Sequence, residues 1–210
     1  MGCGRSREAY KFKTGDLIFF GRETFDGTRN GCKRQLSHCF ISCGTCSKYT
    51  HVGIINIENG KIFVYESAIH HHGFDENGDP VQKEGVQKTK LSDYDTRDWY
   101  VRKRTVSWNV QLNESIYRKG YDWDLRDWCR ARCKCRGWTK RGRGKFCSEY
   151  VAAQLKMNDP ELKMNDPDLM TPKDLAENPD IPYEDIKGPI SKVPPAAYNH
   201  MRGSSYKFKF

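Results

Sequence analysis

The sequence contains no long hydrophobic run. Its longest apolar stretch lies in DLIFF, residues 16–20, far short of the roughly 20 residues that a membrane-spanning helix needs. The N-terminus also lacks the apolar segment of a secretory signal peptide. We therefore expect a protein that is not secreted and that stays in the cytosol or on the cytosolic face of membranes.

Acidic residues are scarce in one stretch of the chain. Residues 126–145 hold nine Lys and Arg but a single Asp, so this stretch carries +8 of the formal net charge of +9. The positive charge therefore belongs to a patch, which is expected to bind anionic lipid headgroups. Nucleic acid is a weaker alternative, because Trp128 and Trp138 lie among the cations, and a solvated loop is another. The basic surface comprises Arg130, Arg132, Lys134, Arg136, Lys140, Arg141, Arg143 and Lys145.

The first residues, MGCGRSRE, match the pattern for N-myristoylation. Gly2 would carry the acyl chain, Ser6 stands at the position that the pattern requires, and Cys3 is a candidate for palmitoylation. One myristoyl chain anchors a protein only marginally, but a second acyl chain or a basic stretch makes the anchor stable. The sequence thus predicts a membrane anchor, with an unmodified tail as the alternative.

Most of the cysteines lie in two clusters, and Cys147 stands apart from both. A cytosolic location argues against disulfides. Cys39, Cys43 and Cys46 are weak candidates for zinc ligands, because their spacing is irregular and no second CxxC completes a known zinc motif. S-acylation or plain thiols are the alternatives, and no metal or other cofactor is expected.

Periodicity and turn signals divide the chain into elements. Strands are expected at 14–21 and 97–105, a hairpin around Asn59-Gly60, and helices at 107–120 and 147–157. The tandem segments KMNDPEL and KMNDPDL, residues 156–169, indicate a loop insertion, because each contains a turn signal.

The hairpin has a register that brings two functional side chains together. With Asn59-Gly60 as a two-residue turn, His51 and Glu66 lie on one face as diagonal neighbours. Gly53 stands directly opposite Glu66 and leaves the intervening space empty. The sequence therefore predicts a histidine held by a carboxylate.

Cys147 begins a predicted helix, and this position suits a nucleophile. The thiolate is the reactive form, and the helix dipole favours an anion at the N-terminus. A histidine can take the thiol proton while a third polar group orients the imidazole, and backbone N–H groups there can bind an oxyanion. Taken singly, each of Cys147, His51 and Glu66 has a purely structural alternative.

The motifs KTGDLIFF, YTHVGIINIENGKIFVYES, YDWDL, FCSEYVAAQL and TPKDL occur in an order that resembles the permuted NlpC-type papain-like enzymes. These form the YiiX/YaeF group, with relatives in large DNA viruses. In this group the histidine strand precedes the cysteine helix, as His51 precedes Cys147 here. The resemblance implies an α+β fold with a small antiparallel sheet packed against the nucleophile helix. It also implies that Cys147 is the nucleophile, His51 the base and Glu66 the third member.

The expected domain spans residues 12–177, with a Cys-rich insertion at 22–50 and the basic insertion at 126–145. An acylated or basic tail, 1–11, precedes it, and a Pro-rich, partly flexible segment, 178–210, follows. The resemblance implies a thiol amidase, peptidase, lipid acyl hydrolase or acyltransferase that forms a thioester with a peptide or lipid substrate at a membrane surface. The alternatives are a non-enzymatic membrane-attached adaptor or virion component, and a nucleic-acid-binding module.

Overall fold

A computed structural model of the chain describes residues 11–21, 46–68, 73–74, 79, 84–94, 99–106, 129, 133 and 145–190. Its strands form one antiparallel sheet with the order β4-β3-β2-β1-β5-β6. The strands are β1 (Leu17–Phe20), β2 (His51–Glu58), β3 (Lys61–Ala68), β4 (Gly85–Lys90), β5 (Trp99–Arg102) and β6 (Lys187–Ile190). The helices are α4 (Cys147–Asn158) and α5 (Pro172–Glu177), with the 3₁₀ helices η1 (Leu91–Tyr94) and η2 (Pro167–Leu169). The fold is thus mixed α+β.

The β2–β3 hairpin confirms the predicted register. Ile55 pairs with Val64, and Ile57 pairs with Ile62. The φ angles of Asn59 and Gly60 are 49° and 74°, and a type I′ turn requires positive φ at both of its central residues. Glycine adopts such an angle at no steric cost, and asparagine tolerates it better than most residues. The local sequence therefore determines how β2 and β3 face each other.

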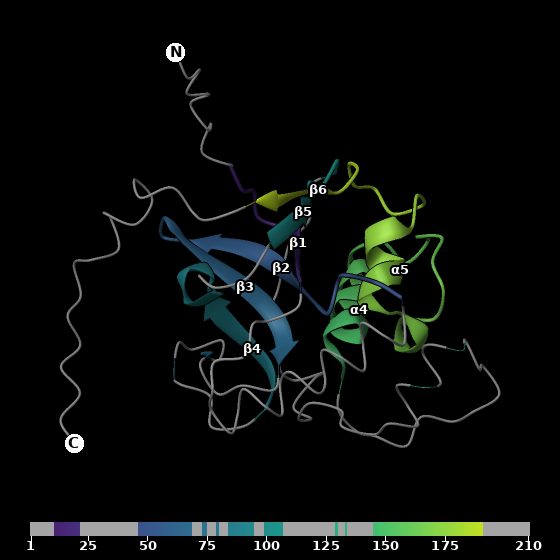
Figure 1. Cartoon of the computed structure of the whole chain (residues 1–210), viewed down its shortest axis with the longest axis horizontal. Helices are drawn as coiled ribbons and strands as arrows, with labels where there is room; N and C mark the ends of the chain where they lie inside the picture. Colours follow the sequence, from purple (N-terminus) through teal and green to yellow (C-terminus); the bar gives the residue numbers. More distant parts are fainter. Residues whose placement is uncertain are drawn as a thin grey trace, which may run out of the picture.

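Alternating side chains give the sheet a hydrophobic core on each face. Leu17 and Phe19 of β1 belong to the core that α4 covers. Ile18 and Phe20 belong to the opposite core, which also contains residues of η1. Successive side chains of a strand point to opposite faces, and β1 is buried on both. Figure 1 shows α4 and α5 lying together beside the sheet.

The last described segment, 187–190, joins the sheet, although the sequence predicts that residues 178–210 lie outside the domain. β6 pairs with β5 at the edge of the sheet. The buried guanidinium of Arg102 donates hydrogen bonds to the backbone carbonyls of Leu175, Asn178 and Glu184, at 2.8, 3.1 and 3.0 Å. A short strand of sequence KGPI has no alternation of apolar and polar residues, so periodicity does not reveal it.

The tandem repeat adopts a different structure in each copy. The first copy ends α4, and the ammonium group of Lys156 donates to the carbonyls of Pro160 and Leu162. The second copy begins η2, where the carboxylate of Asp166 accepts a hydrogen bond from the backbone N–H of Asp168. Leu162 is buried, as is the equivalent residue of the second copy. The repeat is therefore a packed connection from α4 to α5.

Several predicted features lie outside the described residues. They are the tail 1–10, most of the Cys-rich insertion, the helix predicted at 107–120, and most of the basic insertion. Within the described ranges, none of the helices has the length and apolar character that would let it span a membrane.

Candidate active site

Cys147 is the first residue of α4, as the sequence predicted. The preceding residue, Phe146, has an extended backbone, and its N–H donates to the Glu149 carboxylate at 3.1 Å. A carboxylate three residues into the helix that accepts from the capping residue is half of a capping box. The Cys147 thiol is therefore held at the positive end of the helix dipole, where it is only 2% exposed.

The chain leading into Cys147 is fixed at two points. The hydroxyl of Ser67, near the end of β3, donates to the carbonyl of Lys145 at 2.6 Å. The Lys145 ammonium group pairs with the carboxylate of Asp168 in η2. On the other side of Cys147, the Ser148 hydroxyl donates to the carbonyl of Met170 at 2.8 Å. These contacts join the N-terminus of α4 to the end of β3 and to η2.

His51 and Glu66 meet across the hairpin. The distance between His51 Nε2 and Glu66 Oε2 is 2.5 Å, and both residues are buried. The space comes from Gly53, because a Cβ atom there would lie 2.4 Å from Val64 Cγ1 and 3.4 Å from Glu66 Cβ. The predicted diagonal pair is thus present, and the glycine between its members is required by packing.

The imidazole of His51 also interacts with Cys147. Burial lowers the pKa of His51, but the negative charge of Cys147, then that of Glu66, and hydrogen bonds to both raise it, to about 9. The raising effects outweigh burial, so the pKa of His51 lies above its ordinary value and the cationic imidazole is favoured. A cationic imidazole between a thiol and a carboxylate favours the thiolate form of cysteine.

The other oxygen of Glu66 has partners that the sequence does not predict. Oε1 accepts hydrogen bonds from the hydroxyl of Thr89 at 2.6 Å, from Gln87 Nε2 at 3.4 Å and from the phenol of Tyr94. Thr89 and Gln87 belong to β4, and Tyr94 belongs to η1. The segment GVQKTK contains a single apolar residue besides glycine, so its pattern indicates neither a strand nor a functional role. The role of these residues is evident only when β4 is known to pair with β3.

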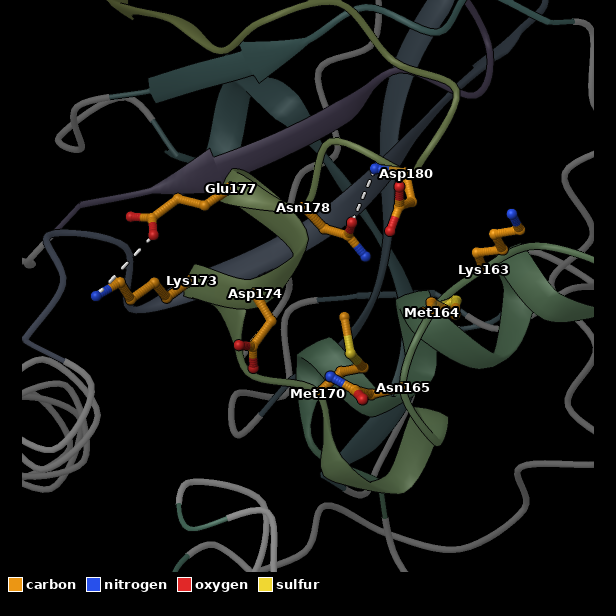
Figure 2. A pocket seen from close by; sticks show the side chains of 9 residues that line it. All are labelled: Lys163, Met164, Asn165, Met170, Lys173, Asp174, Glu177, Asn178 and Asp180. Carbon is orange, nitrogen blue, oxygen red and sulfur yellow. Dashed lines mark hydrogen bonds and ion pairs between the residues drawn. The ribbon is translucent and has the colours of Figure 1, made fainter.

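The described residues include a pocket of about 550 Å³ lined by other side chains. It is open and lies between α5 and the second copy of the repeat (Figure 2), and its lining includes Lys163, Met170 and Asp174. Lys173 and Glu177, which also line it, form an ion pair at 4.0 Å. Cys147, His51 and Glu66 are not among its lining residues.

The remaining predicted site residues are the candidate lipidation sites, the candidate zinc ligands and the basic surface. Gly2 and Cys3, Cys39 and Cys43, and the basic surface other than Lys145 lie outside the described residues. Lys145 is half-buried and paired with Asp168, so its charge is balanced within the fold. Cys46 is exposed, and the part of the chain that the structure describes contains no group of His, Cys, Asp or Glu side chains suited to a metal ion.

Comparisons with solved structures find matches, among them a weak one to a bacterial protein. Neither a family model nor a curated protein matches the sequence. The structure is similar to the crystal structure of the metalloprotein YiiX from Escherichia coli O157:H7, with a TM-score of 0.37 and 16% sequence identity. The alignment covers 88% of this chain and 92% of that chain. A similarity of this strength does not establish a family, so function is inferred from the side chains of the site.

Proposed function

We propose that this protein is a thiol hydrolase of the permuted papain-like type, with Cys147 as nucleophile, His51 as general base and acid, and Glu66 as the group that orients His51. One observation carries the proposal. The imidazole of His51 bonds to the buried carboxylate of Glu66 through Nε2 and interacts with a cysteine at the N-terminus of a helix. A nucleophile, a base and an orienting group in this order are the requirement for thiol catalysis.

In the first half-reaction, the Cys147 thiolate attacks the carbonyl carbon of an amide or ester. Because Nε2 of His51 is bonded to Glu66, Nδ1 is left to face the thiol. The C–S bond forms, and the proton of the imidazolium passes from Nδ1 to the leaving nitrogen or oxygen as that bond breaks. The products are an amine or alcohol, an acyl thioester on Cys147 and a neutral imidazole.

In the second half-reaction, the neutral imidazole accepts a proton from water, and the resulting hydroxide attacks the thioester carbonyl. The C–S bond breaks, a carboxylic acid leaves, and the thiolate–imidazolium pair is restored. An alcohol or amine in place of water would make the reaction an acyl transfer. In both halves an oxyanion forms beside the first turn of α4, where backbone N–H groups of the helix terminus can donate to it.

Acyl trapping tests the proposal without knowledge of the natural substrate. The protein is mixed with p-nitrophenyl acetate, and p-nitrophenolate release and the mass of the Cys147 peptide are followed. We expect a stoichiometric burst of p-nitrophenolate with an acetyl group on Cys147. We expect both to be lost in Cys147→Ala and greatly slowed in His51→Ala. Acylation of Cys147 at the same rate in His51→Ala would contradict the proposal.

The substrate class follows from the predicted membrane anchor. The sequence places two candidate acylation sites, Gly2 and Cys3, and a basic segment on the same chain. We therefore propose that the enzyme works at an anionic membrane surface, on the cytosolic side, and that its substrate is a lipid or a membrane-bound peptide. Nucleic acid is the weaker alternative partner of the basic segment.

Vesicle binding tests the membrane proposal. The myristoylated full chain and Gly2→Ala are sedimented with phosphatidylcholine vesicles that either contain or lack phosphatidylserine. We expect the acylated chain to prefer the anionic vesicles and Gly2→Ala to bind about tenfold more weakly, because one acyl chain and a basic patch each supply part of the anchor. Equal binding to both vesicle types would contradict the proposal. Steeply salt-dependent binding to DNA or RNA would instead favour nucleic acid.

A further inference from the structure

Glu66 is held by a set of donors that the proposed chemistry does not itself use. Its carboxylate is fully buried, and Oε2 bonds to His51 while Oε1 accepts three hydrogen bonds. The donors are the uncharged side chains of Thr89, Gln87 and Tyr94. A carboxylate removed from water is costly unless it is paired and hydrogen-bonded, and bonds to its charged form favour ionisation. The charge on Glu66 therefore depends on these donors.

The hydrogen-bond directions agree with an ionised carboxylate. Gln87 Nε2 donates to the hydroxyl oxygen of Thr89 at 3.2 Å, so the single hydroxyl hydrogen of Thr89 is left to point at Glu66, 2.6 Å away. Turning the Gln87 amide over would place its oxygen against the carboxylate, so electrostatics determines its orientation. Thr89 is thus fixed as a donor to Glu66.

Tyr94 is held in place both at its ring and at its backbone. Its ring packs against Phe20, with 4.4 Å between the ring centroids, and the Trp99 indole N–H donates to its backbone carbonyl at 3.2 Å. The Phe20 ring in turn lies against the ring of His51, with 5.6 Å between the ring centroids. The phenol therefore reaches Glu66 from a residue that β1 and β5 hold in place, and the same Phe20 ring packs against His51.

We propose that Tyr94 and Thr89 are positioning residues of the active site. They keep the Glu66 carboxylate ionised and directed at His51, and thereby extend the reactivity of Cys147 to acidic pH. The inference rests on the proposed function. Among the described residues, the groups that face Glu66 include His51 from β2, Tyr94 from η1, and the uncharged Thr89 and Gln87 from β4. Without these donors the Glu66 carboxylate stabilises the imidazolium of His51 less, and the imidazolium in turn stabilises the Cys147 thiolate less.

The test measures the rate of iodoacetamide alkylation of Cys147 against pH in the full chain, by peptide mass spectrometry. We expect Tyr94→Phe and Thr89→Val each to move the acidic limb of the profile up by about one pH unit, a tenfold loss of rate on that limb, since each removes a bond to a charged group. Thr89→Ser keeps the hydroxyl and should recover most of the rate that Thr89→Val loses. The pH of half-titration of His51, followed by NMR, should fall in the same two variants.

A matched control lies one residue from Glu66. Tyr65 bonds to Glu58 through its phenol, on the face of the sheet that α4 covers. Tyr65→Phe removes the same kind of tyrosine–carboxylate bond and should leave the alkylation profile in place. A profile that shifts equally in Tyr65→Phe, or in neither Tyr94→Phe nor Thr89→Val, would overturn the positioning role. If Cys147 of the unmodified protein lacks reactivity on the acidic limb, the proposed function itself fails.

Discussion

In His51→Ala, the alkylation of Cys147 is expected to be about 100-fold slower near pH 6 than near pH 9. The pKa of His51 is raised to about 9, with the charges of Cys147 and Glu66 outweighing burial. A raised pKa favours the imidazolium, which can stabilise a thiolate below the pH range of an ordinary thiol. An ordinary thiol, with a pKa of about 8.5, is ionised to roughly one part in 300 near pH 6. The helix N-terminus, which the variant keeps, still favours the thiolate and offsets part of that factor.

The quantity to measure is the alkylation rate of Cys147 near pH 6 divided by its rate near pH 9 in the same variant. Cys147 is almost fully buried, so its absolute alkylation rate also depends on how easily iodoacetamide reaches the thiol. This access factor cancels when the rates of one variant at two pH values are divided. Exposed Cys46, read from the same digest, reports the reactivity of iodoacetamide at each pH. If His51→Ala and the unmodified protein give the same ratio, there is no thiolate–imidazolium pair, and Cys147 is a buried structural cysteine.

Glu66→Gln separates the role of the carboxylate from that of the imidazole. Glutamine keeps the shape of the side chain but removes the charge that faces the imidazolium. The ratio should then fall between those of the unmodified protein and His51→Ala, because the charge of Cys147 still raises the pKa of His51. A ratio as low as that of His51→Ala would instead indicate that glutamine displaces the imidazole from the thiol.

The pair of His51 and Glu66 was predictable because a short-range rule determines it. A two-residue turn at Asn59-Gly60 sets the register of β2 against β3, and the register sets the faces. The cysteine helix was predictable for a similar reason, since its apolar residues follow directly on Cys147. Such rules do not determine how the hairpin and the helix are placed relative to each other, because the two elements lie far apart in the sequence.

The donors to Glu66 were not predictable because their roles depend on tertiary pairing. β4 reads GVQKTK, in which Gln87 and Thr89 face Glu66 while Lys88 lies on the other face. In isolation these are ordinary surface residue types. Tyr94 belongs to a 3₁₀ helix of four residues, too short for any periodicity. Functional residues of this kind become visible only when the neighbour of β3 is known.

The site also depends on where the elements end. His51 and Glu66 lie on the face of the sheet opposite to α4, because His51 pairs with Phe20 of the opposite core. Cys147 belongs to the core beneath α4. They meet because His51 is the first residue of β2, Glu66 is near the end of β3 and Cys147 is the first residue of α4. The site is therefore assembled at one end of the hairpin, where a helix terminus can reach across the sheet.

Gly53→Ala is expected to destabilise the protein by about 3 kcal/mol, at the upper end of the range for overpacking a core. The added Cβ would lie 2.4 Å from Val64 Cγ1 and 3.1 Å from the backbone carbonyl oxygen of Tyr65. The Val64 side chain is fully buried, and the carbonyl is part of the strand, so β2 and β3 must move apart. Since His51 and Glu66 bridge these two strands, their contact should weaken as well. Urea unfolding measures the first effect, and the alkylation ratio of Cys147 measures the second.

A second substitution at Val64 shows whether the clash is the cause. Val64→Ala removes the atom that Gly53→Ala would strike, at its own cost of a small cavity. The double variant should therefore be more stable than the sum of the two single effects predicts, with a coupling energy of about 1 kcal/mol or more, and it should recover part of the alkylation ratio. If the two effects simply add, the strands do not meet at Gly53 as described, and this glycine is not what brings His51 within reach of Glu66. If stability recovers without the alkylation ratio, the room at Gly53 serves the fold alone, and other contacts hold His51 beside the thiol.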